Sequence, residues 1–131
     1  MVNWTNLDKV EAYKELEAAA KVNLKEVMTG ANGAERVKKY SVPMAEGMAY
    51  NYAAKQVDDN ILAILGKLAE ETQLVDKFAA LYNGEMINTG EKRLVLHHMC
   101  RGQLGDAVIA DGGDKREFYT GEQKKIEAFA N

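Results

Sequence analysis

The residues of this chain that could do chemistry lie close together. Two adjacent histidines, His97 and His98, are followed by the only cysteine, Cys100. On a helix, His97 and Cys100 are three positions apart and share a face, whereas His98 points about 100° away. Such a set could bind a transition metal, or it could supply a cysteine nucleophile with a histidine base.

Neither chemistry is well supported by the residue types available. A structural zinc site normally has four Cys or His ligands, and the sequence has no second cysteine and no third histidine. A cysteine nucleophile needs a base that faces it and a third group that orients the base, which one helix does not provide. We therefore predict no metal site and no catalytic residue here. We expect Cys100 to be a small buried apolar side chain, and His97 to be a partly buried histidine that donates to a backbone carbonyl.

The element expected to position these residues is a helix that starts after a polar cap. Asn88 and Glu91 have the spacing of a capping box, which predicts a helix that begins at Thr89 and carries Arg93, His97 and Arg101. Glu85 and Glu91 could form an acid/base pair. Because Glu91 is already accounted for as a cap partner, we assign neither of them a catalytic role.

The rest of the chain is predicted to form mainly helices. Apolar residues recur at three- and four-residue steps, and short Gly, Asn and Asp clusters separate the segments. The first expected element is a helix that begins near Thr5 or Asn6, with an apolar stripe that runs to Leu24, and a short helix capped by Asn23 and Glu26 follows it. The next expected elements are a hairpin within 37–52 that turns at Glu46 and Gly47, a helix from Asp58 or Asp59, and a helix from Thr72 to Tyr82 that closes at Asn83 and Gly84. The last are an extended stretch at Val108 and Ile109 and a final helix capped by Thr120 and Gln123.

Length and composition fit a single folded domain over residues 1–131. The chain has 47% hydrophobic and 28% charged residues, which is ordinary for a globular protein. The predicted fold class is mainly α with a short β-hairpin (α+β). A net charge of -3 without basic clusters argues against a nucleic-acid partner, and the short apolar runs argue against a membrane partner. The N-terminal residues lack the basic and apolar regions of a secretion signal, so we expect a cytoplasmic protein.

The segment "GEMINTGEKRLVLHHMCR" also resembles a signature of the glucose-6-phosphate isomerase family, written "GEKIN" followed by two residues and "E-x-R-A-V-L-H-x-A-L-R". Departures occur at Met86, Gly90, Leu94, Met99 and Cys100, where the family usually has Lys, Thr or Ser, Ala, Ala and Leu. The positions that match are Gly84, Glu85, Ile87, Asn88, Glu91, Arg93, Val95, Leu96, His97 and Arg101.

The likeness extends along nearly the whole chain. The stretches "KKYSVPM", "MAYNYAAKQ", the signature and "AVIADGGDK" occur in the order and spacing typical of family N-terminal regions. The resemblance therefore implies that this chain is the N-terminal helical segment of a larger α/β sugar-isomerase-type protein. Its expected partners are the remaining domains of that isomerase, and a homo-oligomer would be another way to cover apolar surface.

The resemblance also implies an activity for the parent protein. Family members interconvert glucose 6-phosphate and fructose 6-phosphate, a step of glycolysis and gluconeogenesis, by proton transfer through an enediol, with no metal or organic cofactor. The family's glycine-serine phosphate loop and its later glutamate, histidine and lysine motifs do not occur in residues 1–131. No catalytic, cofactor-binding or metal residue is therefore assigned, and this chain alone is expected to be inactive. The expected structural residues of the signature are Gly84, Glu85, Ile87, Asn88, Glu91, Arg93, His97 and Arg101.

Two other functions remain open from the residues alone. A stand-alone helical interaction module would show the same amphipathic helices. A metal-binding regulator would need His97, His98 or Cys100 to coordinate a metal.

Overall fold

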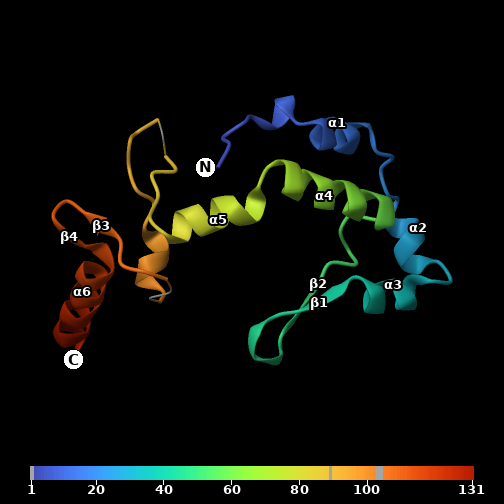
Figure 1. Cartoon of the computed structure of the whole chain (residues 1–131). Helices are drawn as coiled ribbons and strands as arrows, with labels where there is room; N and C mark the ends of the chain where they lie inside the picture. The colour runs from blue at the N-terminus through green and yellow to red at the C-terminus, as the bar shows by residue number, and fades with distance from the viewer. Residues whose placement is uncertain (1, 89, 103–104) are drawn as a thin grey trace. The chain divides into compact units, whose positions relative to one another are not determined.

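The computed structural model describes residues 2–88, 90–102 and 105–131, and it confirms the predicted fold class. Helices dominate, and the strands form two short antiparallel pairs (Figure 1). The chain divides into two compact units, which we describe separately. The N-terminal unit is Trp4–Thr72, and the C-terminal unit is Gln73–Asn131 with the first residues of the chain. That residues 1–131 form a single domain stays a prediction.

The N-terminal unit is built around the pairing of two helices, α1 and α4, which lie side by side. Lys67 of α4 forms an ion pair with Glu15 of α1, with 2.9 Å between Nζ and Oε2. The buried apolar residues of this unit are Val10, Ala12, Tyr40, Ala53, Ile61 and Ile64. Its elements are η1 (Leu7–Lys9), α1 (Glu11–Ala18), α2 (Leu24–Thr29), α3 (Gly33–Lys39), β1 (Ser41–Pro43), η2 (Ala45–Gly47), β2 (Ala49–Asn51) and α4 (Asp59–Glu71).

Two of the helix starts are capped by the side chains that the sequence predicted. The Asn23 side chain accepts a hydrogen bond from the Glu26 backbone N–H at 3.3 Å. The Asp58 carboxylate accepts one from the Ile61 backbone N–H at 2.8 Å. Each bond satisfies an N–H group that has no partner within its helix, so α2 and α4 begin where expected.

The prediction of one long first helix was wrong. Val10 is extended, with φ -99° and ψ 128°, so η1 and α1 are separate, and α1 ends at Ala18. The Ala12 backbone N–H at the start of α1 donates to the Glu71 carboxylate of α4 at 3.2 Å. A cap supplied by another helix thus sets the start of α1, and local periodicity does not contain that information.

The predicted hairpin is confirmed. β1 and β2 pair antiparallel with Val42 opposite Tyr50. The turn between them contains Glu46 and Gly47, both with positive φ, at 57° and 75°. Positive φ values at consecutive turn residues suit the right-handed twist of a tight hairpin.

In the C-terminal unit, the helix starts differ from those predicted, whereas α5 ends at Tyr82 as predicted. Its elements are α5 (Leu74–Tyr82), η3 (His97–Cys100), β3 (Ile109–Ala110), β4 (Gly113–Asp114) and α6 (Lys115–Ala130). α5 begins two residues after Thr72, because Gln73 has left-handed geometry with φ 52°. The predicted cap of the last helix was wrong: α6 begins at Lys115, and the Thr120 hydroxyl donates to the Arg116 carbonyl inside the helix at 2.9 Å. The expected extended stretch at Val108 and Ile109 is confirmed, with Ile109 in β3.

Candidate functional site

The segment that resembled the family signature begins at a turn that requires glycine. Gly84 follows α5 with φ 70°, and the Glu85 backbone N–H donates to the Ala80 carbonyl at 2.9 Å, which closes the end of the helix. A Cβ atom on Gly84 would lie 2.3 Å from Cγ1 of Val108. The backbone of the signature therefore contacts the strand region of the same unit directly, and only glycine fits there.

The predicted helix after Asn88 was wrong, although the predicted polar contacts exist. The Asn88 side chain accepts from the Glu91 backbone N–H at 3.1 Å and donates to the Glu91 carboxylate at 3.2 Å. Asn88 and Arg93 also form an isolated antiparallel bridge, and Lys92 has φ 54°. The Asn side chain thus stabilises a tight turn instead of a helix start, because Asn and Asp can bond locally in either structure. Thr89, the predicted first helical residue, lies outside the described residues.

The histidines and the cysteine lie on the short 3-10 helix η3, and two expectations about them were wrong. Cys100 and His97 are both exposed. Met99 occupies the interior instead: it is fully buried and packs with Leu96 and Val108. In a single 3-10 turn the residues at positions i and i+3 are aligned, so His97 and Cys100 share the solvent face and Met99 the core face.

His98 is half-buried against an aromatic ring. Its ring centroid lies 4.6 Å from that of Tyr82, at the end of α5. Among the described residues, neither ring nitrogen of His98 has a hydrogen-bond partner. His98, Tyr82 and Arg101 line a small cavity of about 300 Å³, and Arg101 itself is exposed.

Arg116 connects several segments of this unit through hydrogen bonds, and the sequence did not reveal this role. Its guanidinium is buried, and it donates from Nε to the Asp106 carbonyl at 2.5 Å and from Nη2 to the Tyr82 carbonyl at 2.6 Å. Asp114 caps α6 beside it, because its Oδ1 accepts from the backbone N–H groups of Arg116 and Val108, at 3.0 and 3.1 Å. The Asp114 cap could have been found, since an Asp after two glycines is a common helix start. The partners of Arg116 are backbone carbonyls, for which sequence carries no signal.

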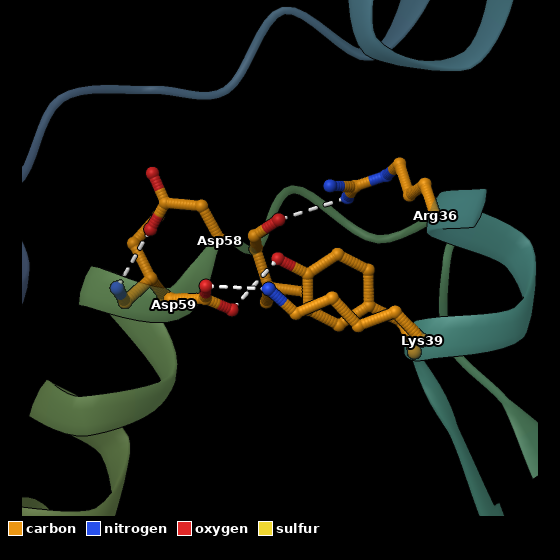
Figure 2. A network of polar contacts seen from close by, with 7 residues as sticks. Arg36, Lys39, Asp58 and Asp59 are labelled. Carbon is orange, nitrogen blue, oxygen red and sulfur yellow. Dashed lines mark hydrogen bonds and ion pairs between the residues drawn. The ribbon is translucent and has the colours of Figure 1, made fainter. Parts of the chain in front are cut away.

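The N-terminal unit contains a second buried arginine with the same kind of partners. Arg36 donates to the carbonyl oxygens of Ala53, Lys55 and Val57 at 2.9, 3.0 and 2.8 Å. Its guanidinium also lies 4.5 Å from the centroid of the Tyr40 ring. Figure 2 shows Arg36 of α3 facing the chain that leads to Asp58. These three hydrogen bonds fix the segment after the hairpin.

A polar cluster continues from Tyr40 to the start of α4. Asp59 accepts from Lys39 at 2.5 Å and from the Tyr40 hydroxyl at 3.1 Å (Figure 2). The hydrogen bond from Lys39 is the main cause that lowers the pKa of Asp59, and the Tyr40 bond adds to it. Burial, followed by the bond to Asp59, raises the pKa of Tyr40. These shifts favour a Lys39–Asp59 ion pair beside a neutral Tyr40 phenol. Such a cluster stabilises the fold and does not transfer a proton at neutral pH.

The described residues show neither a buried carboxylate pair nor a cluster of metal ligands. Glu85 and Glu91 are both exposed, and Glu91 is held by Asn88. No three His, Cys, Asp or Glu side chains gather as a metal site in the part of the chain that the structure describes. Across residues 2–88, 90–102 and 105–131, none of the helices combines the length and apolar content that a membrane span requires.

The elements described above match a known protein family. The family model for phosphoglucose isomerase matches residues 51–131, more than half of the chain and including the whole Gly84–Arg101 segment. This chain belongs to the phosphoglucose isomerase family. The signature likeness read from the sequence is thereby confirmed.

Curated phosphoglucose isomerase relatives match nearly the whole chain. A glucose-6-phosphate isomerase of Treponema denticola is 44% identical over 98% of this chain and 26% of its own length. The protein of the same name from Borrelia garinii subsp. bavariensis is 42% identical over 99% of this chain and 24% of its own length. One from Shewanella woodyi is 37% identical over 75% of this chain. The chain thus spans about a quarter of the length of the first two relatives.

Within this family context, the signature residues have mixed placements. Gly84 and Asn88 have clear structural contacts, and Ile87 is half-buried. Glu85, Arg93, His97 and Arg101 are exposed. The structural role expected for all eight signature residues, Glu91 included, stays a prediction.

Proposed function

We propose that this chain is the N-terminal structural segment of a glucose-6-phosphate isomerase. The parent protein interconverts glucose 6-phosphate and fructose 6-phosphate by proton transfer through an enediol, as the family resemblance implies. One observation carries the proposal: 44% identity runs over 98% of this chain but over only 26% of a glucose-6-phosphate isomerase. The reaction belongs to glycolysis and gluconeogenesis, its expected place is the cytoplasm, and no cofactor is required.

The contacts of the described residues support a structural role for the segment. An enediol step needs a base within hydrogen-bond reach of a carbon-bound proton, in a pocket that also binds the phosphate. Here the most buried cations, Arg36 and Arg116, donate to backbone carbonyls. Glu85 and Glu91 are exposed to solvent. The reactive groups of the parent are therefore proposed to lie in polypeptide outside residues 1–131.

A chimera tests the proposal. The matching quarter of the Treponema denticola isomerase would be replaced by this chain, and isomerase activity would be measured with both sugar phosphates. We expect activity within about tenfold of the unmodified relative, because a segment that keeps its contacts leaves the chemistry intact.

Two controls make the result decisive. The relative without its matching quarter should be inactive, and residues 1–131 alone should show no turnover. Turnover by the isolated chain at about 1 s⁻¹ or more, the range typical of enzymes, would overturn the structural role. A folded chimera with no activity would overturn the assignment to an isomerase.

A further inference from the structure

A groove in the C-terminal unit combines exposed apolar side chains with positive charge. It has a volume of about 630 Å³ and lies between the signature segment and the start of α6. We call it the basic groove, and its lining includes Lys92, Arg93, Leu96, Ile109, Lys115 and Phe118.

The charge of the basic groove is opposite to that of the chain. Three cations line it, Lys92, Arg93 and Lys115, against one carboxylate, Asp111. Asp111 is already bound to Lys115, with 2.7 Å between its Oδ2 and Nζ. Among the described residues, Lys92 and Arg93 form no ion pair. Within residues 2–88, 90–102 and 105–131, two positive charges of the groove therefore lack an ion-pair partner, in a protein whose net charge is -3.

The apolar lining indicates that a polypeptide fills the groove. Ile109 is 72% exposed, Phe118 57% and Met86 50%, and all three line the same groove. Clustered apolar side chains of this size are usually covered by protein, because leaving them in water costs free energy in proportion to their area. A small anion would satisfy the cations but would leave these side chains uncovered.

We propose that the basic groove docks a segment of the remaining isomerase chain in which a carboxylate lies next to an apolar side chain. The family relatives supply the length for such a segment, since this chain spans only 26% of the Treponema denticola protein. Arg93 is the best-suited partner of the carboxylate, because a guanidinium can bind both carboxylate oxygens at once. The apolar side chain lies against Phe118 and Ile109. This inference rests on the proposed function.

Zero-length cross-linking of the chimera described above tests the contact directly. A carbodiimide joins a lysine amine to a carboxylate only where the two are in contact. We expect Lys92 or Lys115 to be linked to an Asp or Glu outside the 131 residues. The internal pairs Lys14 with Glu11 and Lys38 with Glu35, at 2.6 and 2.9 Å, serve as positive controls.

A charge-reversal pair measures the contribution of the groove to binding. This chain would be titrated with the Treponema denticola protein that lacks its matching quarter, and the double variant K92E/R93E should weaken the Kd about tenfold or more. The matched control K14E/K38E has the same change of charge at two exposed lysines outside the groove, and its Kd should change less than about twofold.

The outcomes separate this inference from the proposed function. If an active chimera shows the control cross-links but none from Lys92 or Lys115 to the remaining chain, the docking proposal is overturned while the isomerase assignment stands.

If the chimera is inactive, a peptide tests the groove instead. The peptide acetyl-Leu-Asp-Phe-Glu-Leu-amide is titrated into the isolated chain, with a version carrying Lys in place of Asp and Glu as control. Docking is supported if the NMR signals of Lys92, Lys115 and Phe118 shift with the acidic peptide but not with the Lys control. The absence of these shifts overturns the docking proposal. Saturable binding of inorganic phosphate would assign the groove to an anion, and a dimer that K92E/R93E dissociates would assign it to a second copy of the chain. Either result overturns the docking proposal.

Discussion

Arg116, in the first turn of α6, binds the backbone of Tyr82, the last residue of α5, through a hydrogen bond of 2.6 Å from Nη2 to the carbonyl oxygen. Its Nε donates to the carbonyl of Asp106, in the connection between η3 and β3. A single buried cation thus joins three segments of the C-terminal unit, and no carboxylate neutralises it among the described residues. We attribute its stabilising effect to these two part-buried hydrogen bonds to backbone carbonyls.

Replacement of Arg116 should destabilise the C-terminal unit strongly. R116M keeps most of the side-chain volume but leaves the Tyr82 and Asp106 carbonyls without donors, so we expect a loss of about 2–4 kcal/mol in the free energy of unfolding. Urea denaturation followed by circular dichroism measures the loss. R101M, at an exposed arginine nearby in sequence, should change the free energy by less than about 0.5 kcal/mol. Equal effects of the two substitutions would contradict the proposed role of Arg116.

Gly84 should tolerate no side chain. G84A requires a residue with Cβ to adopt φ 70° and places that atom 2.3 Å from Val108 Cγ1, so we expect a loss of about 2 kcal/mol or more in stability. G121A is the matched control, because Gly121 lies within α6 and a Cβ there meets nothing within 4 Å. This control should stabilise the chain by about 0.5–1 kcal/mol, since Ala favours a helix interior. The thermal unfolding midpoints of the two variants should therefore move in opposite directions.

The sequence predicted well the elements whose signals are local. The Asn23 and Asp58 caps, the hairpin turn at Glu46 and Gly47 and the glycine stop at Gly84 all depend on residues within a few positions of one another. Their preferred backbone geometry is a property of the residue itself, so tertiary context changes it little. The family signature was likewise visible, because it is a pattern of residue types.

The errors occurred where distant residues set the structure. α1 starts where Glu71 of another helix caps it, which no local pattern reveals. Asn88 and Glu91 make the contacts of a capping box, yet the backbone turns at Lys92 and pairs Asn88 with Arg93. Consequently η3 is only four residues long, and the placement of Cys100 was wrong. The buried arginines were missed because their partners are carbonyls, which every residue has.

Met99 and Cys100 are adjacent in sequence but should respond differently to truncation. M99A removes a side chain with no exposed area from the cluster with Leu96 and Val108, so we expect a loss of about 2–4 kcal/mol. C100A should change stability by less than about 0.5 kcal/mol, because the thiol is exposed. In the native wild-type chain, Cys100 should also react with a thiol reagent without unfolding. Protection of the thiol until the chain unfolds would contradict the placement of η3.

The Asp59 cluster should give a measurable dependence of stability on acid. The pKa of Asp59 is below its usual 3.8 in the folded chain, mainly because of Lys39, so its contribution is present above the unfolded pKa and is lost as pH falls through the folded value. The difference in the free energy of unfolding between wild type and D59N should thus be constant above about pH 5 and should decrease toward zero below about pH 4. K39M removes the main partner, so D59N should have a smaller effect in that background. Denaturation midpoints of the four chains from pH 2 to 7 measure both effects, and a difference between wild type and D59N that persists at pH 2 would show that the carboxylate charge is not what stabilises the start of α4.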